Sequence, residues 1–142
     1  MIKYIATFLI VLTTMLVNSQ TVTGNWKTID DETGKAKSIV EIYEQSGMLY
    51  GKVVELFREP SEEQHPKCDK CEDDRKGQPV LGMVIVRDML LKDGFHQKGT
   101  ICDPKNGKIY RCEFWLDKND SNKLQVRGYW GFLYRTQVWE RN

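Results

Sequence analysis

The chain has 142 residues, with 21 basic and 20 acidic side chains and 40% hydrophobic residues. This length supports one domain with a single core, and the even mixture of charges gives no electrostatic basis for binding nucleic acid or an anionic membrane surface. The composition therefore indicates a small globular domain and excludes a strongly basic, nucleic-acid-binding module.

The N-terminal segment has the layout of a secretory signal peptide. Lys3 supplies a basic start, Ile5–Val17 is apolar apart from three threonines, and no cysteine lies near the expected cut after Ser19 to carry a lipid. The alternative, a membrane anchor, needs about 20 apolar residues, and this run is shorter. We therefore expect cleavage of residues 1–19. The mature domain, residues 20–142, then has no stable membrane anchor and is periplasmic or secreted.

After this segment, β-branched and aromatic residues recur in short stretches separated by Gly, Asn, Asp and Pro, a pattern typical of strands and turns. The breaks include the two-residue links Ser46-Gly47 and Gly131-Phe132 and the turn Asp103–Gly107. Consecutive strands with mostly short links predict an all-β fold, an eight-stranded antiparallel up-and-down barrel, with an open sandwich or a curled sheet as the alternative. The predicted strands are Thr23–Ile29, Lys37–Gln45, Met48–Arg58, Val80–Leu91, Phe95–Cys102, Lys108–Leu116, Lys123–Trp130 and Leu133–Arg141.

The connection between the third and fourth strands is much longer than the others. Residues Glu59–Pro79 are charged, poor in apolar residues, and contain His65, Cys68 and Cys71. Long segments in compact domains are functional or disordered. Because neighbouring strands run in opposite directions, this segment shares one end of the barrel with the first, fifth and seventh connections. We therefore predict a lid over one mouth, with a floppy surface loop as the alternative.

Gly24-Asn25-Trp26 opens the first strand. A Gly-x-Trp at the head of such a barrel resembles the lipocalin and avidin-like superfamily, in which the tryptophan plugs the closed end and a basic residue of the last strand packs over its ring. Pairing the last two strands across Gly131-Phe132 places Arg141 at the same end of the barrel as Trp26. We predict a structural closed end with a cation–π contact between Trp26 and Arg141.

The same pairing places Arg135 and Gln137 on one face with Val126, and that face has the apolar character of a barrel interior. A buried arginine needs a carboxylate, a carbonyl or a ligand anion as partner. The structural alternative gives it one of three carboxylates: Glu41, Glu55 or Glu113. The functional hypothesis is a ligand-binding site in which Arg135 and Gln137 contact the polar head of the ligand. Its predicted lining is Arg135, Gln137, Val126, Met83 and Phe114.

Export would carry the four cysteines into an oxidising compartment, where disulfides persist. Cys68-Asp69-Lys70-Cys71 lies in a charged segment, without the helix that lowers the thiol pKa of a redox C-x-x-C motif. With His65 it also offers three ligands of types that zinc binds. We predict a Cys68–Cys71 disulfide, with a redox or metal site as the alternative, and we expect neither metal nor cofactor.

Cys102 and Cys112 flank the turn Asp103–Gly107. With Cys102 opposite Lys108, Cys112 lies opposite Lys98, too far along the strand for the Cα separation of about 7 Å that a direct disulfide allows. We therefore expect both cysteines to be buried thiols or to reach the lid.

The sequence shows no catalytic set. It has no Ser/His/Asp order and no phosphate-binding loop, and its two histidines, His65 and His96, occupy polar, loop-like positions. The acidic pairs Asp30-Asp31 and Asp73-Asp74 are interpreted as solvated turn residues. We therefore do not expect an enzyme.

Six phrases, in order along the chain, resemble the uncharacterised bacterial family catalogued as domain of unknown function 2147. They are Trp26–Lys35, Lys67–Cys71, Gly77–Gly82, Asp103–Tyr110, Leu124–Tyr129 and Arg135–Trp139. The resemblance implies an exported bacterial protein with a lipocalin-like barrel and no established enzymatic activity. Two positions depart from the pattern: Leu133-Tyr134 stands where a glycine often precedes the arginine, and Cys102 stands where an aliphatic residue is expected.

Three functional hypotheses follow. The first is an exported protein that binds a small apolar or amphipathic molecule inside the barrel. The second is a periplasmic structural or interaction module whose barrel is filled by its own side chains. The third is a metal or redox site on the Cys68–Cys71 segment.

Overall fold

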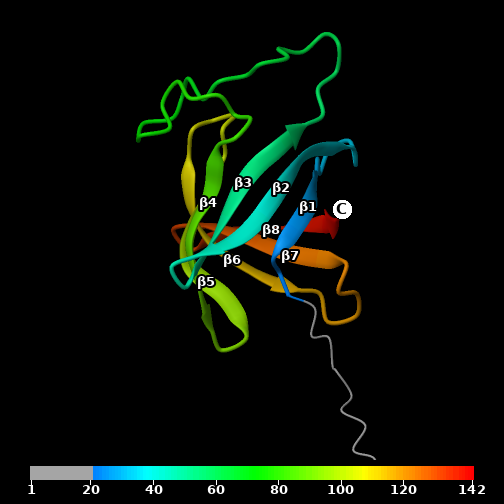
Figure 1. Cartoon of the computed structure of the whole chain (residues 1–142), viewed down its shortest axis with the longest axis vertical. Helices are drawn as coiled ribbons and strands as arrows, with labels where there is room; N and C mark the ends of the chain where they lie inside the picture. Colours follow the sequence, from blue (N-terminus) through cyan, green and yellow to red (C-terminus); the bar gives the residue numbers. More distant parts are fainter. Residues whose placement is uncertain (1–20) are drawn as a thin grey trace, which may run out of the picture.

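The computed structural model describes residues 21–142 as an all-β structure (Figure 1). Eight strands follow one another around a closed barrel, with antiparallel pairing throughout, which confirms the predicted fold. The described residues contain no helix long and apolar enough to cross a membrane. The predicted signal peptide lies outside the described residues. The strands are β1 (Gly24–Ile29), β2 (Ala36–Gln45), β3 (Met48–Leu56), β4 (Val84–Lys92), β5 (Phe95–Cys102), β6 (Ile109–Leu116), β7 (Lys123–Trp130) and β8 (Leu133–Arg141).

The barrel has two ends with different connections. The connections β1–β2, β3–β4, β5–β6 and β7–β8 lie at one end, which is termed the lid end. The long β3–β4 connection, residues 57–83, is termed the lid. The opposite end, termed the far end, carries the β4–β5 hairpin and the residues that lead into β1. Figure 1 shows the lid above the barrel and the β4–β5 hairpin below it.

Two-residue turns set the register of the short hairpins. Ser46-Gly47 joins β2 to β3, and Asp93-Gly94 joins β4 to β5, with φ angles of 53°, 79°, 54° and 81°. Positive φ at both central residues matches the right-handed twist of paired strands, and a glycine adopts it at little cost. Polar-Gly pairs in the sequence therefore mark hairpins correctly.

The fourth strand begins later than predicted. The prediction starts it at Val80, whereas β4 starts at Val84. The Val80 N–H donates to the Pro66 carbonyl (2.9 Å), and the Gly82 N–H donates to the Val53 carbonyl (2.7 Å) with a Gly82 φ of 88°. A regular strand cannot pass through a residue with that φ, so these residues belong to the lid.

The register of the β5–β6 hairpin differs from the prediction by one residue. The structure pairs Cys102 with Ile109 and Cys112 with Gly99, one residue away from each predicted partner. Lys98, the predicted partner of Cys112, has a φ of 67° and lies in the irregular stretch of β5. The shift is already present beside the turn, where the Asp103 N–H donates to the Lys108 carbonyl (2.9 Å). The turn therefore sets the register of both cysteines, and the irregular stretch lies beyond Gly99. As expected, both cysteines are buried free thiols.

One hydrophobic core fills the centre of the barrel. Side chains alternate between the two faces of each strand, so Val40 and Ile42 of β2 are buried while Glu41 between them is partly exposed. Seven core side chains have no surface accessible to water, and therefore no water-sized cavity adjoins them. These are Trp26, Val40, Cys68, Val86, Met89, Phe114 and Leu124.

Candidate functional site

The structure brings Trp26 and Arg141 together at the far end. The Trp26 indole is fully buried and donates to the Val22 carbonyl (2.8 Å), and the Arg141 guanidinium carbon lies 4.3 Å from its ring centroid. Arg141 also donates to the carbonyls of Thr21 (3.1 Å) and Ser121 (3.0 Å). One guanidinium therefore connects the residues before β1, the β6–β7 loop and the core.

Arg135 and Gln137 share the predicted register with β7, because Gln137 pairs with Val126 and Arg135 with Gly128. Arg135 is nevertheless not buried: 68% of its side chain is exposed. Arg135 lies near the start of β8, at the rim of the barrel. A side chain on the inner face of a strand is exposed there, because few residues cover it. The prediction that Arg135 is buried inside the barrel is wrong.

The carboxylate beside Arg135 is also different from the three predicted ones. Arg135 forms an ion pair with Asp31 of the β1–β2 turn, and the Gln137 side chain donates to the same carboxylate oxygen (3.3 Å). Asp31 was interpreted as a solvated turn residue. The β1–β2 turn lies at the rim beside β8, so its Asp31 reaches Arg135. The predicted partner Glu113 does not pair with Arg135.

The other residues of the predicted ligand site, Val126, Met83 and Phe114, are buried in the hydrophobic core, with relative exposures of 3%, 2% and 0%. None of them lines either of the two pockets described below. The structure therefore separates these core residues from the exposed Arg135, and the five do not surround one space.

The lid is ordered around its disulfide. Cys68 and Cys71 are bonded, with their Cα atoms 5.4 Å apart, and both side chains are buried in the barrel core. The backbone closes a loop around them, since the Gly77 N–H donates to the Cys68 carbonyl (2.8 Å) and the Cys68 N–H donates to that of Gln78 (2.9 Å). The predicted disulfide is confirmed, and this part of the lid is not a floppy loop.

Arg75 connects the lid to β4. Its side chain is 2% exposed, donates through Nε and Nη2 to the Asp73 carboxylate (3.1 and 2.7 Å), and donates through Nη1 to the Val84 carbonyl (3.0 Å). Arg75 holds the pKa of Asp73 down to about 2. Arg87 of β4 donates through Nη1 and Nη2 to the two carboxylate oxygens of Asp74 (2.9 and 2.9 Å). Asp73 and Asp74 lie in a turn with 30% and 64% of their side chains exposed, as interpreted, and each also forms an ion pair with an arginine.

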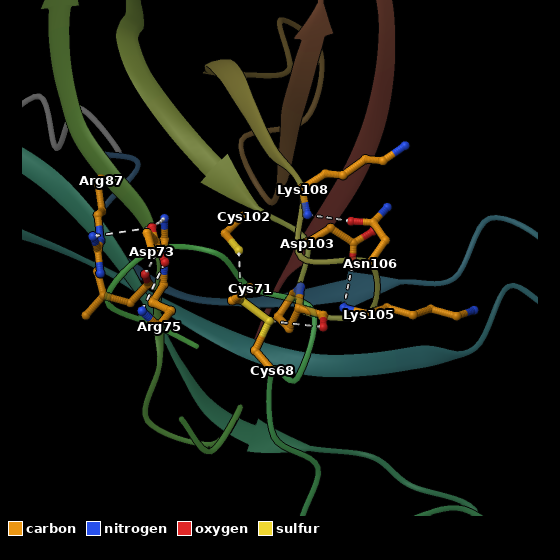
Figure 2. The surroundings of a disulfide bond; sticks show 12 residues. Cys68, Cys71, Asp73, Arg75, Arg87, Cys102, Asp103, Lys105, Asn106 and Lys108 are labelled. Carbon is orange, nitrogen blue, oxygen red and sulfur yellow. Dashed lines mark hydrogen bonds and ion pairs between the residues drawn. A yellow bond between two sulfur atoms is a disulfide. The ribbon is translucent and has the colours of Figure 1, made fainter. Parts of the chain in front are cut away.

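The β5–β6 turn packs against the other side of the disulfide, as Figure 2 shows. A Cβ on Gly107, which has a φ of +72°, would lie 2.0 Å from the Lys70 carbonyl oxygen. Cys68 Sγ lies 3.4 Å from the Pro104 carbonyl oxygen, and Cys71 Sγ lies 3.8 Å from Cys102 Sγ. The turn and the lid therefore fit together closely, and only a glycine fits at this contact.

His65 does not join the cysteines. It lines a pocket of about 460 Å³ between the lid and the end of β3, beside Leu56 and Lys67. Both cysteines of the predicted metal alternative are already in the disulfide. Within residues 21–142, no group of three or more His, Cys, Asp or Glu side chains is placed to hold a metal ion.

A larger pocket, of about 890 Å³, lies at the far end of the barrel. Its walls come from residues 21–23, the end of β2, the start of β3, the β4–β5 hairpin, the end of β6 and the β6–β7 loop, with Arg127 of β7. Apolar and aromatic side chains provide most of its surface, and charged groups and one histidine lie among them. The lining residues are Thr21, Val22, Thr23, Glu44, Leu49, Leu91, Gly94, Phe95, His96, Glu113, Trp115, Leu116, Lys118 and Arg127.

His96 is the titratable group between this pocket and the core. Its ring stacks on Phe114, with centroids 5.3 Å apart, and burial lowers its pKa below the ordinary value of 6.5. The interpretation of His96 as a polar, loop-like residue is wrong, because it is the second residue of β5 and faces Phe114 across the strand pair. Sequence reasoning missed this pocket, and only the hairpin Asp93-Gly94 marked its position.

The β7–β8 hairpin carries exposed aromatic residues at the lid end. Trp130 is 65% exposed and Phe132 is 93% exposed. The Lys108 ammonium lies 4.8 Å from the Trp130 ring centroid, and Arg111 donates to the Gly131 carbonyl (3.3 Å). The hairpin therefore presents exposed aromatic side chains beside two cations, Lys108 and Arg111.

Comparison with known proteins agrees with this architecture. The family model described as "Uncharacterized protein conserved in bacteria (DUF2147)" matches residues 24–141. The chain belongs to this family. Among solved structures, it is similar to the protein HP1028 from the human pathogen Helicobacter pylori, which is described as belonging to the lipocalin family. The TM-score is 0.69 at 19% sequence identity, over 86% of this chain and 83% of that chain. No curated protein matches the chain.

Proposed function

We propose that this DUF2147 protein is an exported, non-enzymatic protein that binds a small, partly apolar ligand in the far-end pocket. The observation that carries the proposal is the pocket of about 890 Å³ beside a barrel centre filled with side chains. Small-molecule sites measure about 300–1,000 Å³ and combine apolar walls with a few polar groups. A lipocalin-like fold is compatible with such binding, but a fold indicates capacity and not use.

The lining indicates which kind of molecule fits. Leu49 and Leu91 offer aliphatic surface, and Phe95 and Trp115 offer aromatic surface, with their ring centroids 5.4 Å apart. His96 lies among them and donates or accepts a hydrogen bond according to its protonation. An apolar body with one polar or anionic group therefore suits this pocket better than a fully charged molecule.

Export rests on the sequence of residues 1–19, with its basic start, short apolar run and small residues before the cut. The periplasm or the extracellular medium would expose the barrel to small apolar molecules. The buried Cys68–Cys71 disulfide suits an oxidising compartment.

Binding is tested by titrating the purified protein with 8-anilinonaphthalene-1-sulfonate, a fluorescent apolar anion. Leu91→Arg places a charge in the far-end pocket at a side chain that is already 67% exposed, so the fold tolerates it. We expect the probe to bind at least about tenfold more weakly, because an apolar surface is replaced by a hydrated group.

Leu81→Arg is the matched control, because Leu81 is 54% exposed and lines the lid-end pocket. We expect its affinity to stay within about twofold of the parent protein. Weaker binding in Leu81→Arg alone would assign the ligand to the lid end. No effect of either substitution, or no binding at all, would contradict the proposal.

A second candidate function, an interaction module, is favoured by the exposed β7–β8 hairpin. Trp and Phe side chains that protrude from a surface mark interaction sites in soluble proteins. Trp130 and Phe132 have no covering segment among residues 21–142. Phe132→Ser leaves the probe affinity unchanged if the far-end pocket is the binding site, and it removes a partner or a self-association that uses the hairpin.

A further inference from the structure

A third sulfur atom lies beside the lid disulfide. Cys102 Sγ lies 3.8 Å from Cys71 Sγ, which is bonded to Cys68. Figure 2 shows the three sulfur atoms in the order Cys102, Cys71, Cys68, with Cys71 in the middle. Thiol–disulfide exchange requires this order, because an attacking sulfur, a central sulfur and a leaving sulfur take part in it.

We propose that Cys102, Cys71 and Cys68 form an internal thiol–disulfide exchange site, which transfers the disulfide from within the lid to a bond between the lid and β5. The Cys102 thiol loses its proton to hydroxide or water, and the thiolate attacks Cys71 Sγ. The Cys71–Cys102 bond forms as the Cys68–Cys71 bond breaks, and the electron pair passes to Cys68 Sγ, which takes up a proton. The numbers of thiols and disulfides stay the same, so no oxidant or reductant is consumed.

The surroundings of the leaving sulfur suit the product. The Pro104 carbonyl oxygen lies 3.4 Å from Cys68 Sγ. In the disulfide this sulfur carries no proton, whereas the released Cys68 thiol can donate to that oxygen. Cys68, Cys71 and Cys102 are each at most 1% exposed, so the exchange occurs inside the protein and external thiols are excluded.

The surroundings of the attacking sulfur set the rate. Burial raises the pKa of the Cys102 thiol, and nearby charges act in both directions: Arg75 and Arg87 lower it, while Asp73 and Asp103 raise it. Only the thiolate attacks, so the exchange is slow at neutral pH and accelerates as the pH rises.

Cys112 is an internal control for specificity. It faces Gly99 in the barrel wall, its Sγ lies 3.8 Å from the Glu113 carbonyl oxygen, and burial raises its pKa to about 12. No disulfide or hydrogen bond joins its sulfur atom to Cys68 or Cys71. A random rearrangement of disulfides would include Cys112, whereas the proposed exchange leaves it as a free thiol.

The exchange changes which two segments of the chain the disulfide joins. The Cys68–Cys71 bond joins residues three apart in sequence, within the lid. The Cys71–Cys102 bond joins residues 31 apart and ties the lid to the barrel wall. The site therefore gives the lid two covalent states, and this chemistry is independent of the far-end pocket.

The exchange is followed by incubating the native protein at pH 7 and pH 9 without oxygen or added thiol. Samples are quenched in acid, alkylated in denaturant and mapped by peptide mass spectrometry. We expect Cys68 to become alkylated as Cys102 becomes protected, about tenfold faster per pH unit while the thiolate is scarce. Cys112 stays alkylated throughout. The substitution C102A abolishes Cys68 alkylation, and C112A leaves it unchanged.

A second variant traps the product. In C68S no sulfur at position 68 can reverse the exchange, so treatment of the native protein with diamide should join Cys71 to Cys102 and leave Cys112 free. A Cys71–Cys112 bond, or three free thiols, overturns the proposal. If C68S does not fold, the native protein decides: Cys68 alkylation at pH 9 that does not exceed the C102A background also overturns it.

Discussion

The two ends of this barrel are built differently. At the lid end, a disulfide, a buried Arg75 and paired Arg87 and Asp74 side chains connect the long loop to β4. At the far end, the Arg141 guanidinium connects the residues before β1 with the β6–β7 loop and Trp26, and a pocket of about 890 Å³ lies beside the β4–β5 hairpin. Covalent and buried ionic contacts resist local opening, whereas a region with few of them opens at low free-energy cost. The comparison teaches that the lid stabilises one end of the barrel. The far end, which has fewer such contacts, has the space for a ligand.

The largest expected effect comes from breaking the buried ion pair of the lid. Asp73→Asn leaves the Arg75 guanidinium, 2% exposed, without its carboxylate. We expect the free energy of unfolding to fall by about 3 kcal/mol, since an uncompensated buried charge is costly. Urea unfolding measures the change. Asp69→Asn, at an exposed lid carboxylate, is the control and should change stability by less than about 0.5 kcal/mol.

The same pair gives the lid a pH dependence. Because the pKa of Asp73 is lowered from 3.8 to about 2 in the folded protein, the unfolded chain binds the proton first as the pH falls. The stability from this pair is therefore complete above about pH 4 and is lost as the pH falls from about 4 towards 2. Asp73→Asn should lack this loss. Equal acid sensitivity of the two proteins would contradict the assignment of this pKa to the Arg75 pair.

A glycine pair separates backbone strain from the contact between the lid and the β5–β6 turn. Gly34 and Gly107 have φ angles of +71° and +72°, but a Cβ meets nothing within 4 Å at Gly34 and lies 2.0 Å from the Lys70 carbonyl oxygen at Gly107. Gly34→Ala should cost about 1 kcal/mol for the left-handed backbone. Gly107→Ala should cost about 2 kcal/mol more. Equal losses of stability for the two variants in thermal unfolding would show that the lid makes no close contact with the β5–β6 turn.

At the far end the largest single contribution should come from Arg141. Arg141→Met removes the cation–π contact with Trp26 and two hydrogen bonds to backbone carbonyls. We expect a loss of about 1–2 kcal/mol in urea unfolding. Arg135→Met, which removes an exposed ion pair, should cost at most about 1 kcal/mol. The reverse order would contradict the view that Arg141 is the brace of the far end.

The smallest effect concerns His96. Burial lowers its pKa below 6.5, so the unfolded chain binds a proton before the folded one, and stability falls as the pH drops below about 6.5. His96→Gln should flatten this dependence in melting curves at pH 7.5 and pH 5.5. His65→Gln, at an exposed lid position, serves as the control. A bound anionic ligand should reduce the acid loss in the parent protein, because it favours the charged imidazole.

The fold could be predicted because its signals are local. Turn pairs such as Ser46-Gly47 fix the hairpins, and alternation along each strand decides which face is buried. The contact between Trp26 and Arg141 could be predicted from the Gly-x-Trp resemblance together with the register of the last two strands. The disulfide could be predicted from the spacing of Cys68 and Cys71 together with the expected compartment.

The site could not be predicted because it depends on where each strand ends. Arg135 points inward by register but lies at the rim, so its burial was misjudged. Arg75 is buried because the lid folds back onto β4, a contact between segments that no periodicity reports. The far-end pocket lies among the β4–β5 hairpin, the end of β6 and the residues before β1, and the sequence gives no measure of the space among these segments.

The most direct test of the central claim is a ¹⁵N–¹H NMR titration of the protein with 8-anilinonaphthalene-1-sulfonate. The account predicts that the amide signals of Leu91, Gly94 and His96 shift with one common dissociation constant, while those of Arg75 and Gln137 stay in place. Shifts centred on Gln137 and the lid, with the β4–β5 hairpin unchanged, would contradict it.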